Sequence, residues 1–360
     1  MSWVLAALGF MVLIVLHEAG HFTAAKLVGM RVEKFALFFG PAIWKKQVGE
    51  TEYSIRTIPA GGYVKITGMN PSEELSDEVR TRAYYSQPVW KRIVVISAGP
   101  AVNIVLGFVL LVLYAGVIGL HKGNEVGDVA KNFPAQGVLH PGDVLVAVDG
   151  QDGSPEELTK HVIAHKCAQQ PPVNGCKATT PATLTIDRGG KLITIKMTPV
   201  YDAKNKRMRL GFTYNLNGGP HETLAPGKAI DTAATAFWRI TKQTVSIPAK
   251  ILDSKQRKEI NGIVGSYETT RQTILADAGD VVLIMAVISM SLAIVNLFPF
   301  LPLDGGHIFW AVVEKIRRKP VPYSVMERSG VVGFVLVLML FAIGLSNDIG
   351  QLSNGGFKAP

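Results

Sequence analysis

The stretch FMVLIVLHEAGHFTAAKLV, residues 10–28, places His17, Glu18 and His21 inside an otherwise apolar run. On an α-helix, residues four positions apart lie about 40° apart around the axis, so both imidazoles face the same side. Two imidazoles at this spacing are typical zinc ligands, and the intervening glutamate is placed to take a proton from a water at the metal. The pattern therefore predicts a zinc centre with Glu18 as its general base.

The apolar surroundings of this motif strengthen the prediction. An HExxH pattern also occurs by chance in soluble helices. Ionisable groups inside a membrane helix are costly, however, unless a ligand or partner satisfies them, so they mark functional sites by default. A buried, hydrogen-bonded cluster without a metal is the alternative, and we expect the metal.

The chain as a whole is too apolar for an ordinary soluble protein of 360 residues. Hydrophobic residues make up 48% of it and charged residues only 18%, and its mean hydropathy is +0.25. Four segments are nearly free of charge, and each is close to the roughly 20 residues that a helix needs to cross a bilayer. We therefore predict a polytopic α-helical membrane protein with about four transmembrane helices, at residues 1–28, 93–120, 281–303 and 329–347.

The cations indicate the topology. Lysines and arginines are frequent between the first and second spans, residues 29–92, and between the third and fourth, residues 304–328. By the positive-inside rule both segments face the cytoplasm, which puts both termini outside and the metal site near the cytoplasmic side. A net charge of +9 also occurs in nucleic-acid-binding proteins, but this distribution predicts a bilayer and no nucleic acid as the partner. The first span lacks a cation before its apolar core, so we interpret it as a retained helix rather than a signal peptide.

The long segment between the second and third spans contains a soluble module. Residues 123–200 alternate short strand patterns with turns and one helical pattern, which predicts a compact α/β module with an antiparallel sheet. Residues 201–280 are a connecting region, in which 228–251 have the pattern of an amphipathic helix. That helix lies either on the membrane surface or against the soluble module. Residues 348–360 form a tail.

The two cysteines, Cys167 and Cys176, both fall in the extracytoplasmic module. The loop between them, AQQPPVNG, is rich in turn formers. An oxidising compartment permits a disulfide between them, and two free thiols are the alternative.

The cytoplasmic segment contains TEYSIRTIPAGGYVKITG, residues 51–68, in which β-branched and aromatic residues flank a Gly-Gly pair. It predicts a membrane-associated β-hairpin or short sheet. An exposed edge of that sheet would accept an extended peptide through backbone hydrogen bonds. The alternative is a hairpin that only plugs the helix bundle.

The third zinc ligand is expected from another span. The third span ends in NLFPFLPLDGGH, residues 296–307, where two prolines break the helix and Asp304 is the one carboxylate. A carboxylate beside two imidazoles completes a three-ligand catalytic zinc site. A helix cap is the alternative role for Asp304. His307 is either a ligand or, as we expect, a structural partner of the ligands.

Together, HEAGH, the GGYVK segment, the inserted module and NLFPFLPLDGGH resemble the bacterial site-2 protease family of intramembrane zinc metalloproteases, over nearly the whole chain. Within the module, GVLHPGDVLVAVDG, residues 137–150, resembles the signature of PDZ domains. The single PDZ-like module and the segments FGP-W and GETEY make actinobacterial-type members the nearest likeness. The loop between the cysteines departs from the usual PDZ pattern.

The resemblance implies a role for individual residues. It carries the zinc ligands over to His17, His21 and Asp304 and the general base to Glu18. It also implies that Asn296 and Asn103 hold the substrate strand or the oxyanion. Gly262 and Gly265 resemble the glycine motif that precedes the third span in the family.

The resemblance also implies substrates and partners. Such enzymes sit in the bacterial inner membrane and cleave transmembrane segments of single-pass proteins, such as anti-sigma factors, after an upstream site-1 protease has trimmed them; some clear signal-peptide remnants. The PDZ-like module would filter substrates by size or bind a newly made C-terminus. Two rival functions remain: a membrane zinc carrier or sensor, which needs no Glu18, and a scaffold that holds no metal.

Overall fold

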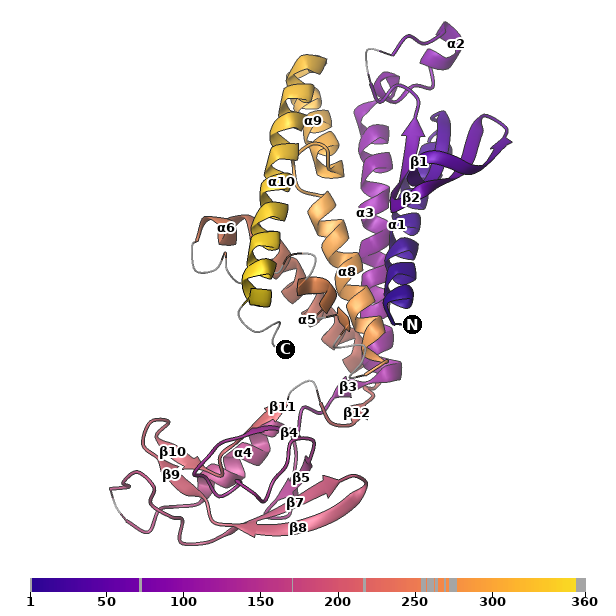
Figure 1. The fold of residues 1–360 in the computed structure, drawn as a ribbon. Helices are drawn as coiled ribbons and strands as arrows, with labels where there is room; N and C mark the ends of the chain where they lie inside the picture. Colours follow the sequence, from indigo (N-terminus) through magenta and orange to yellow (C-terminus); the bar gives the residue numbers. More distant parts are fainter. Residues whose placement is uncertain are drawn as a thin grey trace. The chain divides into compact units, whose positions relative to one another are not determined.

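The computed structural model describes residues 2–70, 73–169, 171–215, 218–253, 257, 262, 265–268, 270–271 and 277–353. The chain divides into two compact units (Figure 1). Residues 1–114 and 227–360 form the first, which we call the helical unit, and residues 115–226 form the second, the PDZ-like unit.

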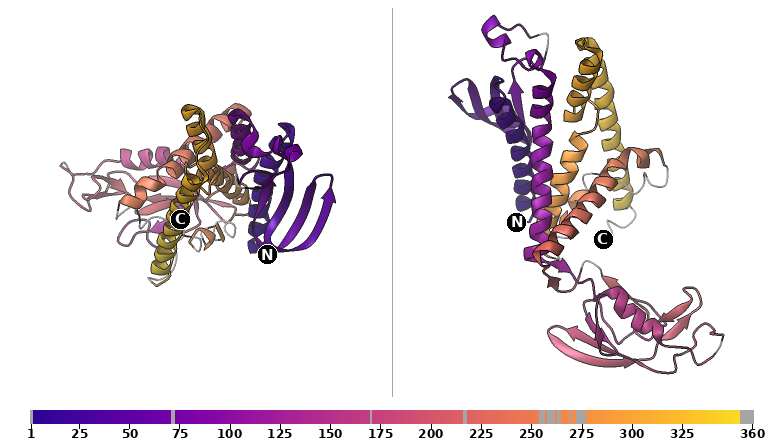
Figure 2. Two further views of the ribbon diagram at one scale, coloured as in Figure 1. Left: turned by 90° about the horizontal axis from the view of Figure 1, so that it is seen from above. Right: turned by 180° about the vertical axis from the view of Figure 1, so that it is seen from behind.

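Helix α3 (Val89–Leu113) is the central element of the helical unit. It packs against α1 (Ser2–Leu27), α8 (Asp280–Asn296) and α9 (Asp304–Arg317). Helix α8 lies between α3 and α10 (Tyr323–Ser353) in views from the front and from behind (Figures 1 and 2). Among the described residues, three helical stretches are long and apolar enough to cross a membrane: Leu8–Leu27, Val89–Ile118 and Ser324–Ser353.

Small residues let α1 and α3 approach closely beside the HExxH motif. A Cβ added to Gly20 on α1 would lie 2.7 Å from the backbone oxygen of Ala98 on α3. The contact between α3 and α8 depends on Gly107 in the same way, because an added Cβ would overlap the Met290 side chain. The close approach at Gly20 fixes how the histidine-bearing face of α1 packs against α3.

The third predicted span, residues 281–303, is not one helix. Helix α8 ends at Asn296 and α9 begins at Asp304. Pro299 and Pro302 explain the break, because proline donates no backbone hydrogen bond and disfavours helical geometry in the residue before it. The segment 304–328, predicted as a cytoplasmic link, therefore begins with a helix that packs on α3.

Glycines allow the break to fold tightly. A Cβ on Gly305 would overlap the backbone at Leu297, and one on Gly306 would overlap the backbone at Leu301. Any side chain at these two positions would push α9 away from the end of α8. The turn thus places Asp304 as the first residue of α9.

The segment between α1 and α3 forms a sheet from β1 (Val32–Val48) and β2 (Thr51–Ile66), which is more extensive than the predicted hairpin. Phe35 pairs with both Tyr53 and Val64, so the first part of β1 lies between the two halves of β2. The register breaks near Gly40, after which the rest of β1 pairs with the first half of β2, ending at Val48 and Thr51. The second half of β2 therefore forms one border of this sheet, and both strands contact α1.

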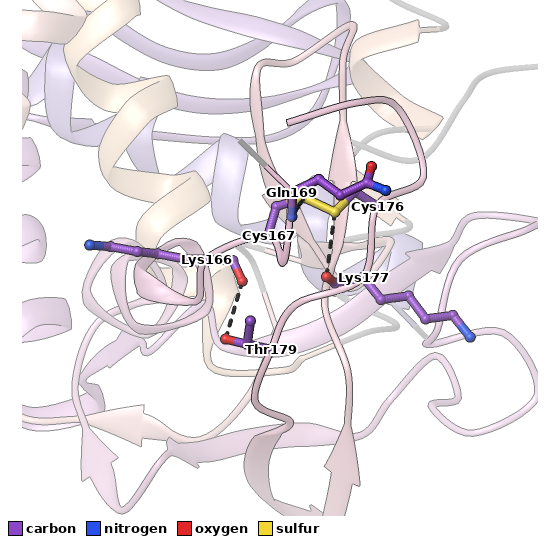
Figure 3. Close-up of a disulfide and its surroundings, with 6 residues drawn as sticks. All are labelled: Lys166, Cys167, Gln169, Cys176, Lys177 and Thr179. Carbon is purple, nitrogen blue, oxygen red and sulfur yellow. Dashed lines mark hydrogen bonds between the residues drawn. A yellow bond between two sulfur atoms is a disulfide. The ribbon is translucent and has the colours of Figure 1, made fainter. Parts of the chain in front are cut away.

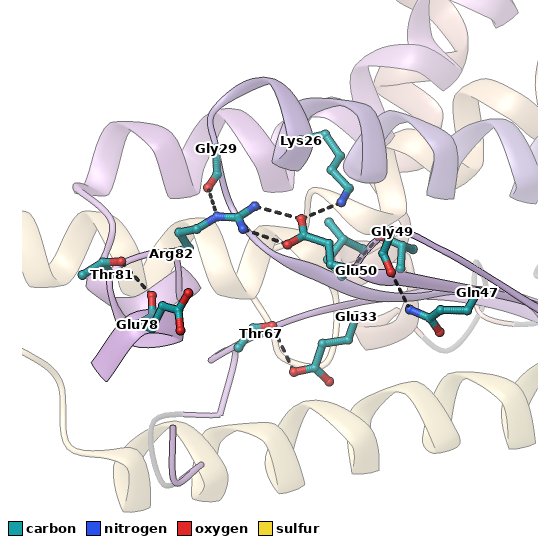
Figure 4. A network of polar contacts seen from close by, with 12 residues as sticks. Lys26, Gly29, Glu33, Gln47, Gly49, Glu50, Thr67, Glu78, Thr81 and Arg82 are labelled. Atoms are coloured by element: carbon teal, nitrogen blue, oxygen red, sulfur yellow. Dashed lines mark hydrogen bonds and ion pairs between the residues drawn. The ribbon is translucent and has the colours of Figure 1, made fainter. Parts of the chain in front are cut away.

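A cluster of polar contacts fixes the turn of this sheet to the end of α1 (Figure 4). Glu50 accepts hydrogen bonds from Lys26 Nζ at 2.8 Å and from both terminal nitrogens of Arg82 at 2.7 and 2.8 Å. Arg82 Nε also donates to the Gly29 carbonyl. Hydrogen bonds from Arg82 and then Lys26 lower the pKa of Glu50 to about 2.

The PDZ-like unit is built on a six-stranded sheet. Strands β11, β4, β5, β7 and β8 follow one another, with β6 paired to β5. Leu145, Leu158, Leu184 and Ile186 lie in its core, and helix α4 begins at a capping box made by Ser154 and Glu157. The elements are β3 (Leu120–His121), β4 (Glu125–Val129), β5 (Val144–Val148), β6 (Gln151–Asp152), α4 (Pro155–Ala164), β7 (Ala182–Arg188), β8 (Lys191–Met197), β9 (Val200–Asp202), β10 (Arg207–Arg209), β11 (Phe212–Asn215) and β12 (His221–Glu222).

This unit extends further along the chain than residues 123–200. It runs from residue 115 to 226, because β11 pairs with β4 and β12 pairs with β3. These late strands are short, and their partners lie about 90 residues earlier in the sequence. The antiparallel α/β character of the module agrees with the prediction.

Cys167 and Cys176 form a disulfide (Figure 3). Both cysteines pack with Ala178, Tyr201 and Met208 in a small apolar cluster apart from the main core. The bridge closes the turn-rich loop against the β9–β10 hairpin.

The amphipathic segment forms α5 (Pro226–Val245), followed by α6 (Ile247–Leu252). Ala233, Phe237 and Ile240 of α5 pack with Leu111 of α3 and Met290 of α8. The apolar face of α5 is therefore covered by helices of the helical unit.

Replacing Glu50 with Gln should destabilise the helical unit by roughly 1 kcal/mol, because the paired cations lose their carboxylate. The folded-state pKa of Glu50 lies below its ordinary value of 4.5. Its contribution is therefore complete above about pH 4.5 and is lost only as the pH falls through about 2. We expect thermal unfolding in detergent to show the same loss at pH 5 and pH 8.

Glu78→Gln is the matched control, since only the backbone carbonyl of Glu78 takes part in a hydrogen bond shown in Figure 4. It should leave the melting temperature unchanged. A Glu50 effect that grows between pH 5 and pH 8 would contradict the ion-pair explanation.

Candidate metal centre

Three side chains from opposite ends of the sequence meet in the helical unit. The Nε2 atoms of His17 and His21, both on α1, are 3.2 Å apart. Asp304, at the start of α9, places Oδ2 3.2 Å from His17 Nε2 and 3.3 Å from His21 Nε2. The three ligand atoms thus form a nearly equilateral triangle.

This triangle has the dimensions of a zinc site. Zinc–ligand bonds of about 2.0–2.1 Å at tetrahedral angles put neighbouring ligand atoms about 3.3 Å apart. Asp304 Oδ2 is buried and makes no hydrogen bond to any described residue, and both histidines are buried as well. A buried oxygen facing two imidazole nitrogens is satisfied by a cation, so the donor set fits zinc.

The backbone of α3 orients His21. Its Nδ1 atom lies 2.9 Å from the carbonyl oxygen of Val95 and donates to it, which leaves the lone pair of Nε2 directed at the centre of the triangle. The ring fits only because residue 99 is glycine: a Cβ there would overlap the imidazole. The Gly99-Pro100 pair in α3 is thus part of the site.

Asn103 lies behind His17 rather than in front of it. Its Nδ2 atom is 3.4 Å from His17 Nδ1, on the side of the ring opposite Nε2. The side chain is fully buried, and its Oδ1 has no partner within the described parts of the chain. The backbone oxygen of Asn103 accepts a hydrogen bond from Ser289 of α8 at 2.9 Å.

A cavity of about 430 Å³ opens beside the triangle. Glu18 lines it next to the histidines and Asp304, and so do Asn296 from the end of α8 and His307 from α9. The other wall is the second half of β2, from Gly61 to Ile66, together with Phe39. Asn103 is not among the lining residues, so its amide does not face this cavity in the described structure.

The sheet approaches the catalytic glutamate directly. A Cβ on Gly62 would lie 3.3 Å from Cγ of Glu18 and 3.1 Å from the Ala36 carbonyl. The backbone N–H of Val64 is within hydrogen-bonding reach of the Glu18 carboxylate. The bordering half of β2 therefore passes within contact distance of the residue expected to act as base.

Comparison with known proteins identifies the family. The model of Peptidase family M50 matches residues 5–340. The chain belongs to peptidase family M50, the site-2 protease family. M50 peptidases are zinc metalloproteases, so the triangle of ligands and the glutamate beside it are the features expected of this chain.

This M50 peptidase aligns with its relatives over nearly their whole length. A Clostridium perfringens protein that bears the name "putative zinc metalloprotease" is 31% identical to this chain. The alignment covers 96% of this chain and 98% of the relative. A Synechocystis protein with the same kind of name is 32% identical, and the alignment covers 93% of this chain and 91% of the relative. Among solved structures, the PDZ domain of the SdrC-like protein from Listeria monocytogenes is 21% identical and covers 26% of this chain and 88% of its own, with a TM-score of 0.22.

The structure brings together His17, Glu18, His21, Asp304 and Asn296 around one cavity of the M50 peptidase. His307 lines this cavity but does not belong to the group of three ligand atoms. Cys167 and Cys176 belong to the PDZ-like unit. Within the glycine motif, the Gly262 N–H donates to Asp348 of α10, and residues 263 and 264 lie outside the described residues.

Sequence reasoning missed the roles of Val95 and Gly99. A backbone carbonyl has no sequence signal, and a glycine within an apolar span is equally consistent with ordinary helix packing. The contacts of both residues with His21 depend on how α1 and α3 cross.

Gly99→Ala should weaken zinc binding of this M50 peptidase by about 10–100-fold, because the added methyl group displaces His21 from the Val95 carbonyl. Zinc affinity can be measured by competition with a chromophoric chelator. Gly227→Ala is the control, since an added Cβ there meets no atom within 4 Å. Unchanged affinity in Gly99→Ala would show that this contact does not position the ligand.

Proposed function

We propose that this zinc metalloprotease hydrolyses peptide bonds within transmembrane segments of single-pass membrane proteins. The observation that carries the proposal is the meeting of three ligand atoms and a glutamate on apolar helices, at a cavity bordered by a β-strand. An HExxH motif in a soluble metalloprotease would not need to lie in a helix apolar enough to cross a membrane, as Leu8–Leu27 is.

His17, His21 and Asp304 would hold the metal. Bound zinc supplies Lewis acidity, which polarises a carbonyl and lowers the pKa of water. Glu18 accepts a proton from the attacking water and returns it to the departing amine nitrogen. Glu18 lines the cavity next to the ligands without belonging to the group of three, which suits a base rather than a ligand.

The second half of β2 would hold the substrate. A transmembrane helix hides its carbonyls in its own hydrogen bonds, so the segment to be cut must unwind first. An unwound segment lying along Gly61–Ile66 replaces these bonds with bonds to the strand. Gly62 leaves room for it beside Glu18. Asn296, which also lines the cavity, would donate from its amide to the carbonyl under attack.

The membrane placement follows from charge. We propose four spans, with α8 as the short third one, both termini extracytoplasmic and the metal centre near the cytoplasmic side of the bacterial inner membrane. The Lys26–Glu50–Arg82 cluster, at the end of α1 that follows the histidines, supports this orientation. Its charged groups suit the aqueous side of the interface.

The substrates are proposed to be anti-sigma factors and similar single-pass proteins, which a site-1 protease has already trimmed and which the PDZ-like unit excludes until then. That unit would act as a size filter or bind the new C-terminus. Signal-peptide remnants have the same chemistry and are a second substrate class. Metal transport is the rival function, but it requires neither Glu18 nor a strand beside it.

Glu18→Ala should reduce cleavage of single-span peptides by about 10²–10⁴-fold while the protein retains its zinc. Asp304→Ala should lose both activity and the zinc ion of this centre, because two imidazoles alone hold the ion weakly. Zinc content by mass spectrometry and peptide cleavage in detergent distinguish the two outcomes. Full cleavage by Glu18→Ala would exclude Glu18 as the base, whereas zinc flux in vesicles without cleavage would favour the carrier.

Asn103 would position His17 for the metal. A histidine that offers Nε2 to zinc carries its proton on Nδ1, which then needs an acceptor. The Oδ1 atom of Asn103 makes no hydrogen bond to a described residue. Turning the amide by 180° places Oδ1 where Nδ2 now lies, 3.4 Å from His17 Nδ1. His17 would then be held by a side chain of α3, as His21 is by the backbone of α3.

Asn103→Leu should therefore lower zinc affinity about 10–100-fold, and Asn103→Asp, which keeps an acceptor, should restore most of it. Asn296→Leu is the contrasting variant: it should reduce kcat/KM with zinc affinity unchanged. Chelator competition on all three variants tests the assignment. Equal zinc affinity in Asn103→Leu and wild type would contradict it.

A further inference from the structure

A second pair of histidines faces each other in the PDZ-like unit. His121 of β3 and His221 of β12 are direct partners across a two-stranded antiparallel ladder. Their Nε2 atoms are 3.2 Å apart, and their ring centroids are 4.2 Å apart. The Nε2 separation equals that of His17 and His21 at the catalytic centre.

The backbone orients His121 as it orients His21. His121 Nδ1 lies 3.3 Å from the carbonyl oxygen of Gly219 and donates to it. The Nε2 of a neutral His121 then carries a lone pair directed at His221. Such a hydrogen bond behind the ring is the usual partner of a metal-ligating imidazole.

The neighbouring charged residues do not oppose a cation at this pair. Side chains alternate between the two faces of a ladder, so Lys122 and Glu222 lie on the face opposite the histidines. They form an ion pair at 3.5 Å, so the lysine charge is compensated there. Both imidazoles are half-buried, which leaves them accessible to an ion.

We propose that His121 and His221 form a second binding site for a divalent transition metal, such as zinc, nickel or copper. Imidazole suits these ions, and the two rings of the PDZ-like unit offer two ligand nitrogens. The site should therefore bind more weakly than the three-ligand centre. It requires no contribution from the catalytic residues.

A metal here would join the two ends of the PDZ-like unit. The chain enters this unit through β3 and leaves it through β12, each only two residues long. The adjoining Lys122 and Gly123 N–H groups donate to Pro220 and Gly218, both at 3.1 Å. So short a ladder is weak by itself, and a bridging ion would suppress its opening.

The test is zinc titration of the full-length protein in detergent after treatment with a chelator. We expect wild type to bind two equivalents, one tight and one weaker, and His121→Ala and His221→Ala to lose the weaker one alone. Asp304→Ala should lose the tight one alone. His161→Ala, in helix α4 of the same unit, should still bind two.

Hydrogen exchange provides a second readout. In the Asp304→Ala protein, zinc should slow exchange of the Lys122 and Gly123 amides, and the additional change His221→Asn should abolish this protection. A single equivalent in wild type, or exchange unaffected by zinc, would show that the two rings only share a hydrogen bond and would overturn the proposal.

Discussion

The structure depends on the cost of keeping two imidazoles and two carboxylates away from water. In an apolar helix bundle such groups have little contact with solvent, so each needs a partner within the protein or on an ion. Asp304 and the two histidines point their ligand atoms at one another, and Glu18 lies beside them. The packing of α1, α3 and α9 follows from this requirement as much as from apolar contact.

Helix α3 contributes no ligand, yet it positions both histidines. Val95 accepts a hydrogen bond from His21, Gly99 makes room for its ring, and Asn103 faces the rear of His17. These three residues are four apart, so they line one face of α3. Helix α3 thus positions both histidines of α1 from one face.

The sequence predicted most of the site because the unusual residues were chemically conspicuous. Charged and imidazole groups in apolar runs led to His17, Glu18, His21 and Asp304, and the two prolines to the break before α9. Long-range pairing escaped prediction: nothing local shows that Phe35 lies between Tyr53 and Val64, or that β11 joins β4. The resemblance implied that Asn103 holds the substrate strand or the oxyanion, but only the crossing of α1 and α3 shows that its amide faces His17 Nδ1.

The ligands come from α1 and α9, which are far apart in the sequence. During synthesis the HExxH helix enters the bilayer long before the ribosome reaches Asp304. A nascent or truncated chain therefore carries two histidines and a glutamate but no complete centre. The complete set of three ligands therefore exists only after Asp304 has been added, near the end of translation.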